Sequence, residues 1–159
     1  RLYRNRGTGM FALVTSAAGT ALGEPSNSRG SATGDYDNDG DLDVVVNNLD
    51  GPPTLLRNDG GNRNNFLVVD LEGRAGNRRA VGAIVTVKAG DLVQRATRRS
   101  GDSYLSHSDN RLHFGLGSRT RGDSIAVRWP NGVTQEFGGM TENASIKIIQ
   151  GVEKPVVVR

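Results

Sequence analysis

The sequence DYDNDGDLD at residues 35–43 places an aspartate at every second position and a glycine at the sixth, and the apolar run VVV follows it. Ca²⁺ prefers six to eight oxygen ligands at about 2.3 to 2.6 Å, and a short loop supplies them by turning alternate side chains inward around a glycine. The pattern predicts a calcium-binding loop, in which the aspartate at the seventh position binds through its backbone carbonyl and the others through their carboxylates. The predicted ligands are Asp35, Asp37, Asp39, Asp41 and Asp43.

The residues after this loop indicate whether helices or strands flank it. An EF-hand loop needs a bidentate glutamate at its twelfth position, which is Val46 here. Residues 44–48 read VVVNN, and β-branched residues favour a strand. The loop is therefore expected between two strands. A metal-free Asp/Asn/Gly turn and a Mg²⁺ site are the alternatives, but five crowded carboxylates repel one another and suit a larger, flexibly coordinated cation.

The composition of the chain is that of a globular protein rich in turns. Its 159 residues are 35% hydrophobic and 23% charged, with 22 glycines and no cysteine. Short β-rich runs between the glycines predict an all-β architecture. No run of 18 apolar residues is present, so no membrane-spanning helix is expected.

The start of the chain and its calcium loop suggest where the protein acts. The sequence begins at Arg1 without a charged-then-apolar leader, and we expect it to be a fragment or a mature piece of a longer protein. Weak calcium loops stay filled where calcium is millimolar. The sequence therefore predicts a secreted protein in an extracellular or periplasmic location.

Charge is distributed unevenly along the chain. Residues 1–62 hold 5 basic and 8 acidic groups, a net charge of −3, whereas residues 63–159 hold 15 and 9, a net charge of +6. Arginine pairs well with carboxylates, phosphates and sulfates, so an anionic partner for the second part remains open. Nucleic acid is disfavoured, because only Tyr104 and Trp129 are candidate stacking residues and no RNA-binding signature is present.

Residues 1–62 contain a repeated pattern. LYRN at residues 2–5 and LLRN at residues 55–58 are each followed by a glycine turn, and they lie 53 residues apart. A period of about 50 residues is typical of a β-propeller blade. Residues 17–27, rich in small residues, are expected to form a loop between blades. Strands are expected at residues 10–15, 43–48 and 54–57.

The rest of the chain is expected to form a second β domain. Residues 92–98 alternate apolar and polar side chains, which predicts a strand with one face in water. Residues 130–132 read PNG, and Asn-Gly is a strong hairpin signal. Seven short strands at this spacing favour a small β-sandwich or barrel. The expected strands are residues 66–71, 83–88, 92–98, 111–114, 124–129, 133–137 and 145–149.

The first part resembles the FG-GAP or VCBS-type repeat of calcium-binding propellers. The resemblance is carried by LYRN, the glycine turn, Phe11 and residues 34–43. It implies a structural Ca²⁺ held by the five aspartates between two strands of a blade. It also implies remaining propeller blades elsewhere in a parent chain, because a closed propeller needs several blades.

The second part is similar to the ASPIC/UnbV domain that follows FG-GAP repeats in the cartilage acidic protein-like family of secreted proteins. Two positions depart from the family pattern, namely Ser103, where glycine is usual, and His107, where glutamine is commoner. The resemblance identifies the domain better than its biochemical role. The matching segments are NFL at residues 65–67, NR at 77–78, GA at 82–83, YLS at 104–106 after Gly101, HFGLG at 113–117, RWPNG at 128–132 and Gly151.

Other motifs have simple structural explanations. SHSD at residues 106–109 contains the residue types of a hydrolytic triad, but neighbours in one short loop rarely converge as nucleophile, base and orienter. RGD at residues 121–123 is expected where a turn enters a strand. Asn143 begins the glycosylation acceptor pattern NAS. His113, within an apolar strand, is expected to be a hydrogen-bonded structural imidazole.

The sequence thus predicts a non-enzymatic, calcium-stabilised extracellular module for adhesion or for interaction with a protein or glycan. Its expected parts are a terminal blade at residues 1–62, a β domain at 63–151 and a tail at 152–159. A glycan-binding module is one alternative, and it requires an exposed aromatic shelf containing Tyr104 or Trp129. A catalytic or accessory domain of a secreted enzyme is another, and it requires His107 to meet a carboxylate and a nucleophile.

Overall fold

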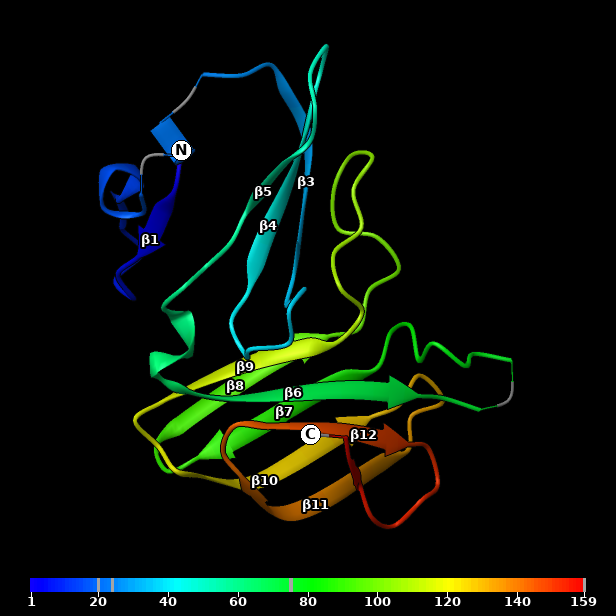
Figure 1. Ribbon diagram of the computed structural model, residues 1–159. Coiled ribbons are helices and arrows are strands. Elements are labelled where there is room, and N and C mark those ends of the chain that lie inside the picture. Colours follow the sequence, from blue (N-terminus) through cyan, green and yellow to red (C-terminus); the bar gives the residue numbers. More distant parts are fainter. Residues whose placement is uncertain (20, 24, 75, 159) are drawn as a thin grey trace.

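The structure is a computed structural model that describes residues 1–19, 21–23, 25–74 and 76–158. Its regular elements are strands and three short 3-10 turns, so the prediction of an all-β protein is confirmed. Figure 1 shows a small sheet and a hairpin standing above two larger stacked sheets. No helix among the described residues is long and apolar enough to cross a membrane.

The upper region holds an antiparallel hairpin and a three-stranded antiparallel sheet of order β3-β4-β5. The glycine turn of the first repeat closes the hairpin, with φ of 78° at Gly7 and 79° at Gly9. The elements are β1 (Tyr3–Asn5), β2 (Phe11–Leu13), η1 (Thr15–Ala17), η2 (Ala21–Gly23), β3 (Ser28–Gly34), β4 (Asp43–Asn48), β5 (Thr54–Leu56) and η3 (Gly61–Arg63).

The two copies of the repeated pattern end differently. The first copy forms β1 and pairs with β2, the strand that follows its glycine turn. The second copy forms β5, but after it the chain passes through η3 and enters the first strand of the lower domain. The strand that follows the second copy therefore belongs to a different sheet. Residues 17–27, expected as a plain loop, carry η2 and the end of η1.

The lower region is a sandwich of two four-stranded sheets, of order β11-β10-β7-β8 and β13-β12-β6-β9. All neighbours are antiparallel except β6 and β12, which run parallel. All seven strands expected in this domain are present. The elements are β6 (Asn65–Glu72), β7 (Ile84–Ala89), β8 (Leu92–Thr97), β9 (Leu112–Gly117), β10 (Arg121–Arg128), β11 (Thr134–Thr141), β12 (Ala144–Ile149) and β13 (Val156–Val157).

Alternating apolar side chains build one hydrophobic core between these sheets. The register of β7 with β10 sets Val85 opposite Val127 and Val87 opposite Ile125, and all four are buried. Burial of each such side chain stabilises the fold by about 1.5 to 3 kcal/mol. Within the described residues the core cluster lies wholly in the sandwich. Its members are Leu67, Val69, Leu71, Ala80, Ala83, Val85, Val87, Ala89, Phe114, Leu116, Ile125, Val127, Trp129, Phe137, Ala144, Ile146 and Ile148.

Two sequence-based expectations about the ends of strands need correction. Residues 152–159, predicted to be a tail, contribute β13, which pairs with β12 through Val156 and Val157. Residues 121–123, predicted to form a turn, are the first part of β10, where Gly122 pairs with Met140 of β11. In both places the extended segment pairs antiparallel with a strand adjacent to it along the chain, β12 for β13 and β11 for β10, and the short local sequence carries too little alternation to predict it.

A long loop between β8 and β9 joins the two regions, and it rises beside β3 in Figure 1. The backbone N–H of Asp109 donates to the carbonyl of Thr33 at 2.8 Å, and the N–H of Thr33 donates to Ser108 Oγ at 3.2 Å. The outer edge of β3 is therefore covered by a segment of the sandwich domain. This contact and the foot of the β3-β4 connection fix where the small sheet stands.

Candidate metal centre

The acidic stretch forms the connection between β3 and β4 at the foot of the small sheet, so the prediction of a loop between two strands is confirmed. Gly34, the last residue of β3, pairs with Asp43, the first of β4, and this pair closes the loop. Two residues in the loop have positive φ, 59° at Asn38 and 102° at Gly40. Asparagine and glycine are the residue types that adopt such angles at least cost.

Three of the five predicted ligands converge. Asp35, Asp37 and Asp39 each offer a carboxylate oxygen, and these oxygens lie within 4.8 Å of one another. Asp35 is only 6% exposed, and its Oδ2 accepts a hydrogen bond from the N–H of Gly40 at 3.1 Å. Its Oδ1 is buried and has no hydrogen-bond partner among the described residues. An unpaired buried carboxylate oxygen is costly, and a bound cation would satisfy it.

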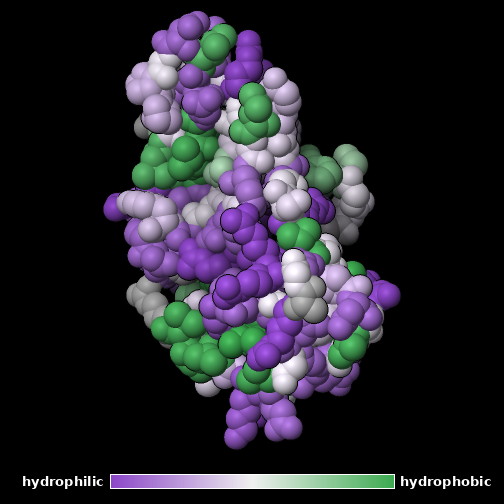
Figure 2. Space-filling view, turned by 90° about the vertical axis from the view of Figure 1, so that its right-hand side faces the viewer, coloured by the Kyte–Doolittle hydropathy of each residue, from purple (hydrophilic) through white to green (hydrophobic). Residues whose placement is uncertain are grey.

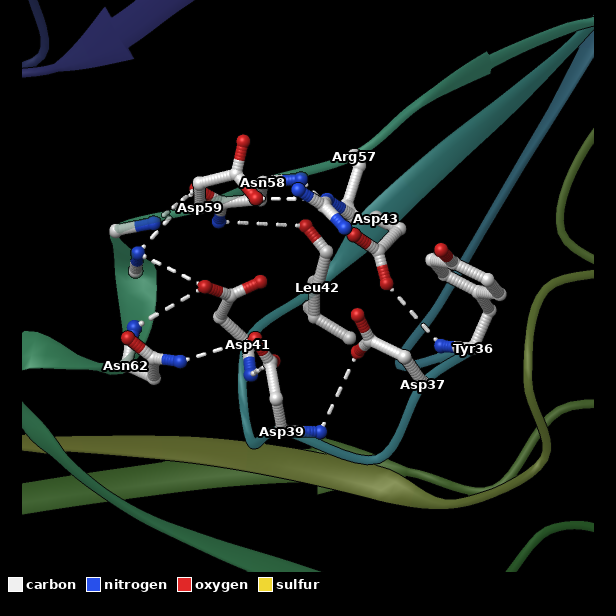
Figure 3. A network of polar contacts seen from close by, with 12 residues as sticks. Tyr36, Asp37, Asp39, Asp41, Leu42, Asp43, Arg57, Asn58, Asp59 and Asn62 are labelled. Atoms are coloured by element: carbon white, nitrogen blue, oxygen red, sulfur yellow. Dashed lines mark hydrogen bonds and ion pairs between the residues drawn. The ribbon is translucent and has the colours of Figure 1, made fainter.

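Asp43, the fourth predicted carboxylate ligand, is placed outside this cluster. It is buried, and its Oδ2 accepts a hydrogen bond from the N–H of Tyr36 at 3.1 Å while its Oδ1 accepts one from the N–H of Asn58 at 2.9 Å. Figure 3 shows this carboxylate between the start of the loop and the end of β5. Asp43 therefore ties the loop to the third strand, and each oxygen keeps a further lone pair for a ligand.

Asp41 has a similar tying role on the other side of the loop. Its Oδ2 accepts the N–H groups of Gly61 at 3.0 Å and Asn62 at 3.2 Å, and its Oδ1 is buried without a partner among the described residues (Figure 3). Burial raises the pKa of the Asp41 carboxyl, the nearby Asp39 and Asp43 carboxylates add to the rise, and the two N–H groups oppose it. Keeping the carboxylates of the loop ionised therefore costs free energy unless a cation is bound.

The asparagines that follow β5 are site residues that the sequence pattern did not reveal. Asn62 Nδ2 donates to Asp39 Oδ2 at 3.0 Å and orients this carboxylate. Asn58 Nδ2 donates to the carbonyl of Leu42 at 3.4 Å. Their only sequence signal is that they flank the glycine turn of the second repeat, which by itself predicts a turn and nothing more.

A cavity of about 640 Å³ lies where the loop meets the sandwich. Asp35 and Asp39 of the loop line one part of it, and Arg111 of β9's preceding loop and Asn143 line another. Carboxylate oxygens, amides and solvent access together suit a hard cation that binds oxygen ligands. A softer metal is disfavoured, since the chain has no cysteine and His113, the nearer histidine, is engaged by a carbonyl.

The side chains in residues 106–109 that have the residue types of a hydrolytic triad make other contacts within the described part of the chain. Ser106 Oγ donates to the carbonyl of Tyr104, and Ser108 Oγ accepts from Thr33 N–H. Asp109 Oδ2 forms an ion pair with Arg111 at 2.6 Å. Residues 106–109 therefore have a structural role in their own loop. This agrees with the expectation that neighbours in one short loop do not form a catalytic triad.

The structure also places the RGD sequence, the potential glycosylation site and the two candidate aromatic residues. Asp123 of the RGD sequence lies in β10, where its Oδ2 accepts the N–H of Gly90 at 2.6 Å. Asn143, the potential glycosylation site, accepts the N–H of Phe66 through Oδ1 at 3.2 Å. Trp129 is only 1% exposed, whereas Tyr104 is 73% exposed. An aromatic shelf for a glycan, which was expected to contain Tyr104 or Trp129, therefore depends on Tyr104.

Comparison with known proteins assigns similarity to both regions. The family described as FG-GAP-like repeat matches residues 1–46, and the family described as ASPIC and UnbV matches residues 73–155. Cartilage acidic protein 1 of Mus musculus is 30% identical over 138 residues, which is 82% of this chain and 21% of the relative. The Homo sapiens protein of the same name is 32% identical over 138 residues, 82% of this chain and 20% of the relative. The chain thus spans about a fifth of the length of these curated relatives.

Proposed function

The chain belongs to the ASPIC and UnbV family, with an FG-GAP-like repeat before that domain, and from this premise we propose that it is a non-enzymatic, calcium-stabilised module of an extracellular protein. In this proposal Ca²⁺ binds the loop between β3 and β4 through Asp35, Asp37 and Asp39, with Asp41 and Asp43 completing the ligand set. The ion neutralises the loop and fixes the foot of the small sheet. The sandwich then presents surfaces for a protein or glycan partner.

The observation that carries the proposal is Oδ1 of Asp35, which is buried without a hydrogen-bond partner among the described residues and lies within a cluster of three carboxylates. Ordinary acidic turns point their carboxylates into water or towards backbone N–H groups. Here, within the described part of the chain, this oxygen is buried among like charges and meets no backbone N–H group. Ca²⁺ relieves both costs, because it supplies positive charge and accepts six to eight oxygens at flexible angles.

The exposed apolar side chains of the upper region support a second part of the proposal, that the remaining propeller blades of a parent chain cover the small sheet. Val45 and Leu55 are neighbours on one face of this sheet and both are well exposed. Figure 2 shows hydrophobic patches on the molecular surface separated by a hydrophilic belt. A propeller blade buries both faces against its neighbours, which explains apolar residues at these positions.

Calcium binding is tested by titrating the purified chain with CaCl₂ in a calorimeter and by melting it with and without a chelator. We expect saturable binding of one ion and a higher Tm with calcium. At a calcium concentration of about 100 times Kd, linkage predicts roughly 2.7 kcal/mol of added stability. No heat of binding and identical melting curves would refute the proposed site.

The substitution Asp37→Asn provides the matched test, because it removes one charge while keeping the oxygen that accepts the N–H of Asp39. We expect calcium affinity to fall about tenfold, since the charge of the ligand set tunes the affinity of such loops. Asp50→Asn is the control, because Asp50 is an exposed aspartate outside the loop. The control should bind calcium as the unmodified chain does.

A further inference from the structure

The calcium loop is contacted from below by side chains of the sandwich domain. His113 of β9 lies with its Nε2 2.7 Å from the carbonyl oxygen of Gly40. A carbonyl only accepts hydrogen bonds, so Nε2 carries the proton and donates. Phe66 of β6 stacks on the His113 ring, with centroids 5.7 Å apart and an interplanar angle of 17°.

Phe66 also meets the backbone of the loop directly. A Cβ added to Gly40 would lie 2.0 Å from Phe66 Cε1 and 2.1 Å from Phe66 Cζ. The glycine is thus required by its positive φ and also by the close approach of an aromatic ring from the other domain. The turn of the loop rests on a platform formed by Phe66 and His113.

Arg111 fixes the first half of the loop in the same way. Its guanidinium donates from Nη1 to Asn38 Oδ1 at 2.8 Å and from Nη2 to the carbonyl of Asp35 at 2.9 Å. Asp109 holds that guanidinium through Nε at 2.6 Å, and the backbone of Asp109 is itself bonded to β3. Three side chains of the sandwich region therefore contact the loop at Asp35, Asn38 and Gly40.

We propose that Arg111, His113 and Phe66 are positioning residues for the calcium loop, so that the sandwich supplies the outer support of a metal site whose ligands all lie in the FG-GAP-like repeat. This inference rests on the proposed calcium site. The ligands are carried by a loop with positive φ at two positions, and side chains from the other domain hold both of those residues. Groups that hold ligands in place commonly change metal affinity by about 10 to 100-fold when they are removed.

By linkage, the coupling also acts in the opposite direction. Calcium that orders the loop strengthens its contacts with β6 and β9, so the sandwich edge gains stability from an ion that it does not ligate. The ion thereby fixes how the small sheet stands on the sandwich.

His113→Phe tests this proposal, because it keeps a ring to stack on Phe66 but removes the donor to Gly40. Arg111 is a poorer choice, since its removal also changes the charge beside the loop. Calcium affinity is measured by calorimetry on the whole chain, and we expect Kd to rise about tenfold. His113→Gln should restore most of the affinity, because its terminal amide can donate to the same carbonyl. The control is His107→Phe, the same change at an exposed histidine that makes no side-chain hydrogen bond within the described residues.

The outcomes separate the two proposals. If the unmodified chain binds no calcium, the calcium site itself is refuted and the positioning role with it. If the unmodified chain binds calcium and His113→Phe, folded by circular dichroism, binds it equally well, only the positioning role is refuted. Weaker binding by His113→Phe, recovery in His113→Gln and an unchanged His107→Phe support it.

Discussion

The two regions of this chain bury opposite kinds of side chain. Among the described residues of the sandwich the buried side chains are almost all aliphatic or aromatic, and Arg98 is the buried charged one. In the described part of residues 1–62 the buried side chains are Asp35, Asp41 and Asp43, while Leu55 and Val45 are well exposed. The sandwich is therefore stabilised by its own core. The upper region is organised by carboxylates that hold backbone N–H groups and, as we propose, an ion.

This difference explains why the position of the loop depends on contacts with the sandwich. A three-stranded sheet without a covered hydrophobic face is marginal in water. Its fixed points are the hydrogen bonds from Asp43 and Asp41, the contacts of Arg111 and His113, and the strand-like contact with the loop before β9. All of these contacts are polar. Water competes with polar contacts and weakens them, whereas an ion that orders the loop strengthens them.

The largest expected effect comes from the sandwich core. Ile146 of β12 is completely buried, so Ile146→Ala should cost about 2 to 5 kcal/mol in the free energy of unfolding, through lost burial and a cavity. Leu55→Ala in the upper region is the counterpart, and because Leu55 is 47% exposed we expect a change within about 0.5 kcal/mol. Urea unfolding measures both. Equal losses would show that the upper region has a hydrophobic core of its own.

A smaller effect is expected at the contact between the regions. Gly40→Ala forces a Cβ into the Phe66 ring and a side chain onto φ of 102°, which should cost about 1 to 3 kcal/mol and weaken calcium binding. Gly9→Ala isolates the backbone contribution, because Gly9 has φ of 79° and no atom of the described residues lies within 4 Å of its added Cβ. Unfolding in the presence and absence of calcium measures both variants. Identical calcium affinities would contradict the docking of the loop on Phe66.

The smallest effect concerns pH and a partly exposed ion pair on the sandwich. Lys147 Nζ lies 3.1 Å from Glu72 Oε2 and lowers the pKa of Glu72 below its ordinary value of 4.5. A lowered folded pKa contributes stability above the unfolded value, and this stability is lost as pH falls through the folded pKa. Lys147→Met should therefore flatten the acid loss of stability slightly in calcium-free buffer. Lys154→Met, at a lysine without an ion pair among the described residues, should leave the pH profile unchanged.

Much of the fold could be predicted because its signals are local. The alternation in residues 92–98 and the Asn-Gly turn at residues 131–132 each depend on neighbours in sequence, and β8 and the β10-β11 connection were found there. Strand β13 could not be predicted because two valines are too few to show a period, and its pairing with Ile146 of the neighbouring strand β12 is a tertiary contact. Strand β3, rich in Ser, Gly and Thr, was implied only by the need for a strand before the loop.

The acidic loop in which Asp35, Asp37 and Asp39 converge could be predicted from the sequence, but the side chains that support it could not. Alternate aspartates around Gly40 signal a calcium loop because ligand spacing is a property of nine consecutive residues. The support from Phe66 and His113 is a property of tertiary structure, since nothing in the NFL or HFG motifs indicates which backbone they will meet. Asp41 and Asp43 show the same limit, because their hydrogen bonds reach Asn58 and Gly61 beyond β4.

The most direct test is amide hydrogen exchange, measured by mass spectrometry with and without calcium. It shows whether a bound ion stabilises the upper region as the hydrophobic core stabilises the sandwich. The account predicts that chelation strongly accelerates exchange in β3, β4 and the loop between them. It predicts a modest acceleration in β6 and β9 and no change in β7 and β10, which lie in the other sheet of the sandwich. Exchange that is equally slow in β3 and β4 with and without calcium would contradict the account.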